Sequence, residues 1–169
     1  MSAQKRKKLA LVTTIWGWRN HANHMGERFL NGYPLNGKWH RPEMDVAGAY
    51  VHQRPADTDL SGLKAERFDF EIYPTIAETL RLGTDKIAVE AVLLIGEHGD
   101  YPDNEKGQKL YPRRRLFEEI VKVFRRAGRS VSLFNDKHFS YSWSDAEWMY
   151  GQSKELGFPL MAGSSVPVA

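Results

Sequence analysis

Short apolar runs alternate with amphipathic stretches along this chain, and the alternation predicts strands separated by helices. Most of the apolar runs are nearly continuous, as expected for strands that are buried on both faces of a sheet. Six strands are predicted, at 8–15, 46–53, 68–73, 88–95, 130–134 and 158–162. The intervening helices are predicted at 20–31, 60–66, 74–82, 112–127 and 144–156.

Proline and glycine mark the ends of several predicted helices. Pro74 and Pro112 stand in the first turn, where a missing N–H costs least, and Gly83 and Gly128 follow the last turns. Repeated strand–helix–strand units give a parallel sheet with right-handed crossovers. The sequence therefore predicts the α/β class: a Rossmann-like, doubly wound, mostly parallel six-stranded sheet with helices on both faces. One domain is expected over residues 8–169, after a disordered basic segment at residues 1–7.

The composition of the 169-residue chain fits one globular domain and narrows the chemistry. Because the chain has no cysteine, a disulfide framework, a thiolate nucleophile and a zinc–thiolate site are excluded. The formal charge is only +3, and no stripe of basic residues with interleaved aromatics is present, so no nucleic-acid partner is expected. No apolar run reaches the about 20 residues that cross a bilayer, and no signal-peptide cleavage site follows residues 9–18. We therefore expect a cytoplasmic protein with no membrane partner.

In sheets of this type, ligands bind outside the carboxyl ends of the strands, where the strand order reverses. A dinucleotide needs a glycine-rich turn after the first strand, but that loop has only Gly17, flanked by Trp16 and Trp18. This argues against ordinary NAD binding. If a nucleotide does bind at this edge, its contacts are expected from the loops that follow the strands. The candidate cofactor-binding residues are Thr14, Trp16, Gly17, His21, Arg54 and Gly96.

Titratable side chains crowd the loops after the fourth and fifth predicted strands. Glu97 and His98 follow the strongest apolar run of the chain, and Asp136, Lys137 and His138 follow the next strand. Loops that a rigid scaffold positions concentrate function, so these five residues are predicted to be catalytic. Two structural alternatives stay open. In one, the loop after the fourth predicted strand is an ordinary turn. In the other, Asp136 forms a buried ion pair with Lys137 or another residue.

Three consecutive arginines, at 113–115, occupy the first turn of the helix predicted after Pro112. Positive charge at that end opposes the helix dipole, at a cost of about 0.3–1 kcal/mol for one charge. An anionic ligand would offset this cost. Pairing with acids of the preceding loop is the favoured explanation, and the candidates are Asp100, Asp103 and Glu105.

Four stretches in the second half of the chain match the layout of a known family. They read AVEAVLLIGEHGDYP, SVSLFNDKH, SDAEWMYGQSKELG and FPLMAGSS. They resemble the N-terminal Rossmann domain of the glucose-fructose oxidoreductase / inositol dehydrogenase (Gfo/Idh/MocA) family. The resemblance implies that Lys137 is the lysine which, in this family, lies beside the nicotinamide and assists proton transfer at the substrate hydroxyl.

The chain also departs from that family. Asp136 stands where the family motif has glutamate, and His138 stands where it has proline. The glycine fingerprint is absent, and so is the acidic residue that holds the ribose after the second strand. The segments GEHGDYPDNEKGQKLYPRRR and FNDKHFSYSW also resemble longer bacterial proteins of no established function. A further C-terminal, substrate-binding domain is therefore expected to be missing from the sequence given.

Three functions stay open at this point. The first is a diverged oxidoreductase-like domain that binds a small molecule, either a nucleotide such as NAD or NADP or another anionic ligand. The second is a metal-dependent enzyme in which nitrogen and oxygen ligands hold a divalent ion that activates water. Its candidate ligands are His21, His24, Glu97, His98 and His138.

The third function is a non-catalytic binding or assembly module. Trp143, Trp148, Met149 and Tyr150 would then form an apolar surface for a homo-oligomer or for a second domain. Core packing is the simpler interpretation of Trp148 and Met149, because they lie at helical spacing from the apolar face.

Overall fold

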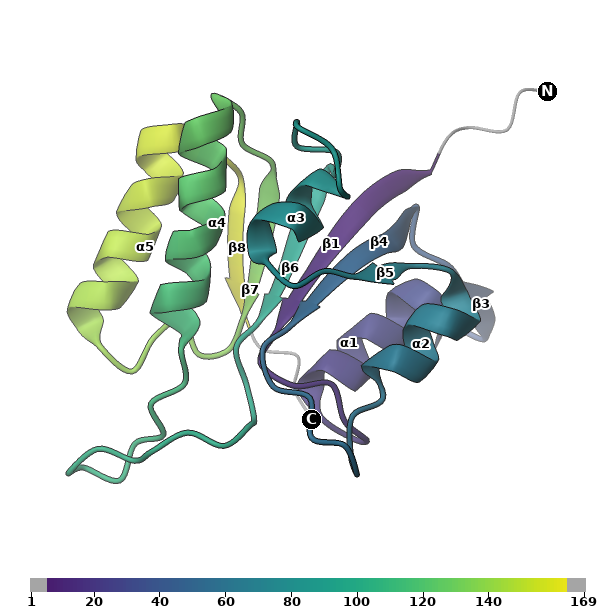
Figure 1. Ribbon diagram of the computed structural model, residues 1–169, viewed down its shortest axis with the longest axis horizontal. Helices are drawn as coiled ribbons and strands as arrows, with labels where there is room; N and C mark the ends of the chain where they lie inside the picture. Colours follow the sequence, from purple (N-terminus) through teal and green to yellow (C-terminus); the bar gives the residue numbers. More distant parts are fainter. Residues whose placement is uncertain (1–5, 164–169) are drawn as a thin grey trace.

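The computed structural model describes residues 6–163 and contains one parallel sheet between two layers of helices (Figure 1). The strands of the sheet are β1 (Lys7–Thr13), β4 (Met44–Val51), β5 (Glu71–Ile72), β6 (Ala91–Ile95), β7 (Ser132–Asp136) and β8 (Leu160–Gly163). The helices are α1 (His21–Leu30), α2 (Ser61–Phe68), α3 (Ile76–Arg81), α4 (Arg113–Ala127) and α5 (Trp143–Leu156). Residues 1–5 of the segment predicted to be disordered lie outside the described residues.

The strand order is β5-β4-β1-β6-β7-β8, and every pairing in this sheet is parallel. The chain builds outward from β1 through β4 to β5, and then returns to the other side of β1 to build β6, β7 and β8. The order therefore reverses between β1 and β6, which makes their carboxyl ends the switch point of the sheet. The predicted Rossmann-like fold class is confirmed.

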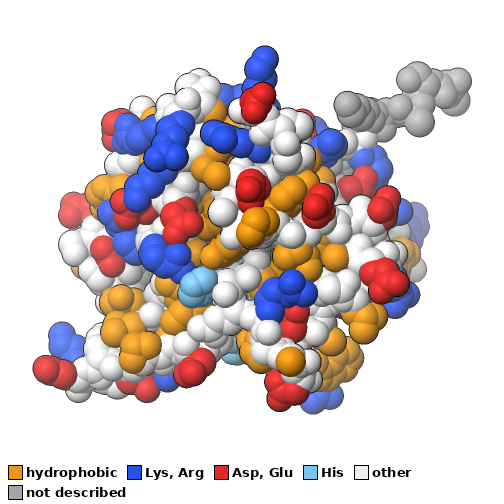
Figure 2. Space-filling model, in the orientation of Figure 1, with side chains coloured by type: hydrophobic (Ala, Val, Ile, Leu, Met, Phe, Trp, Pro, Cys, Tyr) orange, Lys and Arg blue, Asp and Glu red, His pale blue; other side chains and the backbone are white. Residues whose placement is uncertain are grey.

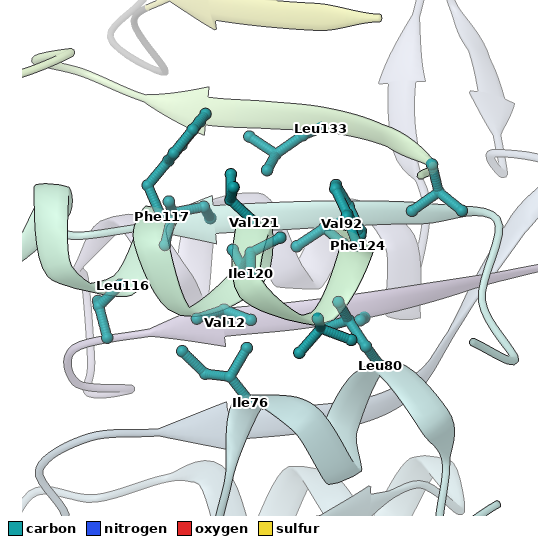
Figure 3. Close-up of a cluster of buried hydrophobic side chains, with 14 of the residues drawn as sticks. Val12, Ile76, Leu80, Val92, Leu116, Phe117, Ile120, Val121, Phe124 and Leu133 are labelled. Carbon is teal, nitrogen blue, oxygen red and sulfur yellow. The ribbon is translucent and has the colours of Figure 1, made fainter. Parts of the chain in front are cut away.

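The pleat of the central strands divides the core into two layers, because successive side chains point to opposite faces. Val12 of β1 and Val92 of β6 pack with α3, α4 and α5 on one face, where Phe117 and Phe124 fill the space under α4 (Figure 3). Leu11 of β1 packs with α1 and α2 on the other face. Buried apolar residues on both faces explain the continuous apolar runs in the sequence.

The aromatic residues around α5 separate into two groups. Met149 is fully buried, and Trp148 packs against the same core as Phe117, as the core interpretation predicts. Trp143 and Tyr150 are 83% and 53% exposed. Only these last two remain as a candidate apolar surface on this helix.

The strand predicted at 68–73 is mostly wrong. Phe68 is the last residue of α2, and Asp69 ends that helix in a left-handed conformation, with φ of 55°. Only Glu71 and Ile72 pair with β4. The alternation of apolar and polar residues was real, but here it spans a helix end and a short edge strand.

The sequence analysis also missed a hairpin after α1. Strands β2 (Tyr33–Leu35) and β3 (Lys38–His40) pair antiparallel and form a separate two-stranded sheet. The turn is Asn36-Gly37, and both residues have positive φ, of 50° and 70°. Such a pair favours the two-residue turn of a tight hairpin, so the sequence did carry a signal for it.

Arg113 pairs with Glu97, an acid of the preceding loop, but none of the three loop acids named in the sequence analysis pairs with an arginine at the start of α4. Arg114 and Arg115 pair with glutamates one turn further along the helix, Glu118 and Glu119, at 2.9 and 2.6 Å. The helix holds such partners at a fixed short distance, whereas the loop acids lie on a segment that projects from the sheet edge (Figure 1). On the face drawn in Figure 2, charges of both signs are interspersed.

Candidate functional site

The candidate site lies at the carboxyl ends of β1, β6 and β7. The loop after β6 is tied to β1, because the Thr14 hydroxyl donates a 2.6 Å hydrogen bond to the carbonyl oxygen of Glu97. Six polar side chains from four segments meet at this edge. We call them the carboxyl-edge cluster, and they are His21, Glu97, His98, Arg113, Asp136 and Lys137.

A histidine–aspartate pair connects α1 to β7 within this cluster. Nδ1 of His21, the first residue of α1, lies 2.5 Å from Oδ2 of Asp136, the last residue of β7. Asp136 is fully buried, while the side chain of His21 is 15% exposed. The His98 ring lies edge-on to the His21 ring, with 5.2 Å between centroids. Asp136 therefore has a partner that the sequence analysis did not specify.

Glu97 forms the second buried contact of the cluster. Its carboxylate accepts a hydrogen bond from Nη2 of Arg113, and its Oε1 lies 3.6 Å from the Lys137 ammonium. The side chains of Glu97 and Arg113 are only 11% and 5% exposed. Arg113 was not predicted as a site residue, although the run of arginines after Pro112 marked the position as unusual.

Two neighbouring glycines make room for this arrangement. A Cβ atom on Gly96 would lie 2.6 Å from Cγ of Arg113. Any side chain at position 96 would therefore clash with the arginine side chain where it passes the end of β6. A Cβ on Gly99 would lie 2.7 Å from the ring of Tyr101. Gly96 is one of the predicted cofactor-binding residues, and in the structure its lack of a side chain leaves room for Arg113.

His98 has an unusual backbone and an altered acidity. Its φ is +66°, in the left-handed region that costs a non-glycine residue free energy and that is often found at functional sites. Burial lowers the pKa of His98, and the neighbouring His21 and Lys137 lower it further, against the opposite effect of Glu97 and Asp136. His98 is therefore a neutral imidazole at neutral pH.

The structure does not bring every predicted residue into the cluster. His24, one turn beyond His21 on α1, is exposed and lines a groove on the sheet face instead. His138 is exposed next to Lys137. Within residues 6–163, no three His, Asp or Glu side chains form a group that could hold a metal ion.

The residues after β1 do not fit a dinucleotide. Trp16 stands where the glycine-rich turn would begin, is fully buried, and stacks on Phe70 with 5.9 Å between centroids. Its carbonyl accepts a hydrogen bond from the N–H of Leu60, and a Cβ on Gly17 would lie 3.3 Å from the carbonyl oxygen of Thr58. The segment before α2 thus covers the turn that a pyrophosphate must approach.

The residues after β4 also lack the contacts that would hold a ribose. The Gln53 amide exchanges two hydrogen bonds with the backbone of Asp100, at 2.8 and 2.9 Å. Arg54, a predicted cofactor contact, pairs with Asp59 at 2.8 Å. These contacts join the end of β4 to the loop after β6 and to the segment before α2, where the carboxylate of Asp59 is already paired with Arg54.

His52, the first residue after β4, contacts an aromatic residue of the loop after β6. His52 Nδ1 lies 2.6 Å from the Tyr101 hydroxyl, and the two rings stack with 5.9 Å between centroids. Burial and the guanidinium of Arg115 lower the pKa of His52, and burial raises the pKa of Tyr101 to about 12. Both rings are therefore neutral at neutral pH and close the space between β4 and the loop after β6.

An apolar groove lies on the sheet face that α1 only partly covers. Its volume is about 910 Å³, and β6, β7 and β8 form its floor. The apolar side chains that line it include Met25, Phe29, Leu93, Phe134, Leu160 and Met161. Parallel sheets are normally covered on both faces, and among the described residues no helix covers this part.

Comparison with known proteins supports the fold. No protein-family model matches the sequence, and no curated protein matches it. Among solved structures, biliverdin reductase from Synechocystis sp. PCC 6803, with biliverdin and NADP+, matches with a TM-score of 0.56 and 10% identity over 92% of this chain. Myo-inositol 2-dehydrogenase from Lactobacillus plantarum matches with a TM-score of 0.56 and 10% identity over 94%. An oxidoreductase from Agrobacterium radiobacter, with NAD+, L-tartaric acid and magnesium, gives 0.57 and 16% over 94%.

These matches show that the chain has the fold of a Rossmann domain, as found in the three matched oxidoreductase structures. The resemblance to the N-terminal domain of inositol dehydrogenases and their relatives is confirmed at that level. This chain spans only 35–37% of the length of the three matched chains. None of the helices in the described part of the chain has the length and apolar character required to span a membrane.

Proposed function

We propose that this chain is an oxidoreductase-like Rossmann domain that binds a small, oxygen-rich anion, rather than a dinucleotide, at the carboxyl-edge cluster. The proposal is supported by how deeply the acidic and the nitrogen-bearing side chains of this edge are buried. The carboxylates of Glu97 and Asp136 are buried and paired. The nitrogen-bearing side chains of His98, Lys137 and His138 are more exposed. Nitrogen donors and positive charge are what recognise carboxylate and phosphate groups.

Lys137 is the residue on which binding depends most. Its ammonium lies 3.6 Å from Glu97 Oε1, too far for a strong hydrogen bond. Glu97 already accepts from Arg113, so an ammonium with three donors keeps capacity for a ligand. The family resemblance implies that Lys137 corresponds to that family's substrate-side lysine, which supports this role.

Thermal unfolding with two probe anions, L-tartrate and inorganic phosphate, tests the proposal. A probe at 100 times its Kd is expected to stabilise the fold by about 2.7 kcal/mol. Lys137→Ala is expected to remove this shift. Lys122→Ala is the matched control, because Lys122 is 57% exposed and pairs with Glu118 on α4, and it should keep the full shift.

Two other outcomes would overturn the proposal. A shift with NAD or NADP and with neither anion would mean that a nucleotide binds despite Trp16. A shift with a divalent ion alone, reversed by a chelator, would favour the metal-dependent alternative. The lack of a three-ligand group among residues 6–163 weighs against that second result.

The apolar groove supports a second proposal, that a further protein domain packs against β6, β7 and β8. This chain spans only 36–37% of the length of the matched structures, and Met161 at the groove is 66% exposed. We expect this chain to be monomeric at micromolar concentration in sedimentation experiments and to bind the apolar dye ANS. Phe134→Lys should weaken the dye signal, and Trp143→Lys should not. A dimer that Phe134→Lys dissociates would show that a second copy, and not another domain, covers the groove.

A further inference from the structure

One carboxylate of the carboxyl-edge cluster is shared between two cations. Glu97 accepts a hydrogen bond from Nη2 of Arg113 through Oε2, and its Oε1 lies 3.6 Å from the Lys137 ammonium. The side chains of Glu97, Arg113 and Lys137 are 11%, 5% and 24% exposed, so solvent ions screen these charges only weakly. Two positive charges therefore compete for one negative charge in a mostly buried place.

The two contacts of Glu97 differ in strength. Arg113 makes a hydrogen bond between opposite charges, whereas 3.6 Å is too long for a good hydrogen bond from Lys137. If Arg113 released it, the buried carboxylate would lack compensation for its charge. Lys137 is then the partner at hand, and a shift of about 1 Å would give the usual distance of a charge-assisted hydrogen bond.

The protein holds Arg113 in place by contacts that do not involve Glu97. Arg113 is the first residue of α4, and its side chain passes Gly96, where a Cβ would lie 2.6 Å from its Cγ. The guanidinium lies over the ring of Tyr111, 4.9 Å from the centroid, and Tyr111 packs edge-on against Tyr101. The loop between β6 and α4 therefore directs the guanidinium toward Glu97.

We propose that Arg113 is a positioning residue of the anion site, which holds the Glu97 carboxylate away from Lys137 and so leaves the Lys137 ammonium available to the ligand. This inference rests on the proposed anion binding. Arg113 acts through Glu97 and does not bind the anion itself, because only 5% of its side chain is exposed. Glu97 is then an inhibitory group of the site. Paired closely with Lys137, it would neutralise the charge that attracts the anion.

A double-mutant cycle with the probes L-tartrate and inorganic phosphate tests this role. Arg113→Met is expected to weaken the binding of both anions by about tenfold, as the loss of one charge-assisted hydrogen bond from Lys137 would give. Glu97→Gln should bind them at least as tightly as the unmodified chain, because it removes a negative charge beside the site. When Glu97→Gln is present, adding Arg113→Met should change the affinity by less than about twofold, since no carboxylate remains to pair with Lys137.

Arg126→Met is the matched control for the loss of a positive charge. Arg126 lies in the last turn of the same helix, about 20 Å from Arg113 at about 1.5 Å per residue, so this variant leaves the cluster intact. It should keep the affinity of the unmodified chain. Tyr111→Leu replaces Arg113→Met in the cycle if that variant does not fold. It removes only the ring under the guanidinium, and it should weaken binding unless Glu97→Gln is also present.

NMR of the lysine ammonium groups gives a readout that a loss of stability alone would not change. Arg113→Met is expected to slow the exchange of the Lys137 ammonium protons with water, because Glu97 then accepts one of them. Lys122, which is 57% exposed and pairs with Glu118, is the internal reference and should not change. Unaltered exchange at Lys137 would show that Glu97 does not move to it.

The outcomes separate the failure of this inference from failure of the proposed function. If neither anion binds the unmodified chain, the proposed anion binding is wrong, and the role of Arg113 is wrong with it. If the anions bind and Arg113→Met weakens binding equally with and without Glu97→Gln, Arg113 acts on the anion directly and only this inference is wrong. Unchanged binding in Arg113→Met would also contradict it, since Glu97 would then not compete for Lys137.

Discussion

Replacing Trp16 by alanine is expected to lower the free energy of unfolding by about 3–5 kcal/mol, as for other buried large aromatic residues. Trp16 is fully buried, stacks on Phe70, and packs so closely on α1 that a Cβ on Gly26 would lie 2.8 Å from its ring. Because the ring lies directly against Gly26, the cavity that its removal leaves can close only if α1 moves. Urea unfolding followed by circular dichroism measures the change.

Trp18→Ala is the matched control for this prediction. Trp18 lies two residues further along the same loop but is 73% exposed, so its replacement should change the stability by less than about 0.5 kcal/mol. Equal losses for the two variants would show that Trp16 is not a packing residue. A gain of NAD binding in Trp16→Ala would show that the tryptophan alone blocks the nucleotide. We expect no such gain, because Gln53 and Asp100 close the second half of that site.

The arrangement of the sheet could be predicted from hydrophobic patterning because its central strands are buried on both faces. The run from Leu9 to Val12 faces α1 and α2 with one set of side chains and α3 to α5 with the other. A short, continuous apolar run of this kind is typical of a central strand in a parallel sheet. Edge elements gave weaker signals. β5 pairs through two residues only, and its apolar neighbour Phe70 is buried without belonging to a strand.

The candidate site could be predicted in part because the switch-point rule depends only on strand order. Once β1, β6 and β7 are neighbours, Glu97 and Lys137 must follow adjacent strands, and the structure places them 3.6 Å apart. The partners from helices could not be predicted in this way. His21 reaches Asp136, and Arg113 reaches Glu97, through helix positions that depend on side-chain packing rather than on sequence spacing. The groove was also missed, since an uncovered sheet face has the same apolar pattern as a covered one.

The buried pair of Arg113 and Glu97 gives the second large effect. Arg113→Met is expected to lower the free energy of unfolding by about 3–5 kcal/mol, because it leaves a carboxylate that is 11% exposed without its main partner. Arg115→Met, two positions along and 45% exposed, should cost less than about 1 kcal/mol in the same urea titration. Adding Glu97→Leu to Arg113→Met removes the unpaired charge, so the double variant should regain most of the lost stability. A double variant as unstable as Arg113→Met would mean that the arginine acts by filling the space over Gly96, and that the charge of Glu97 is tolerated alone.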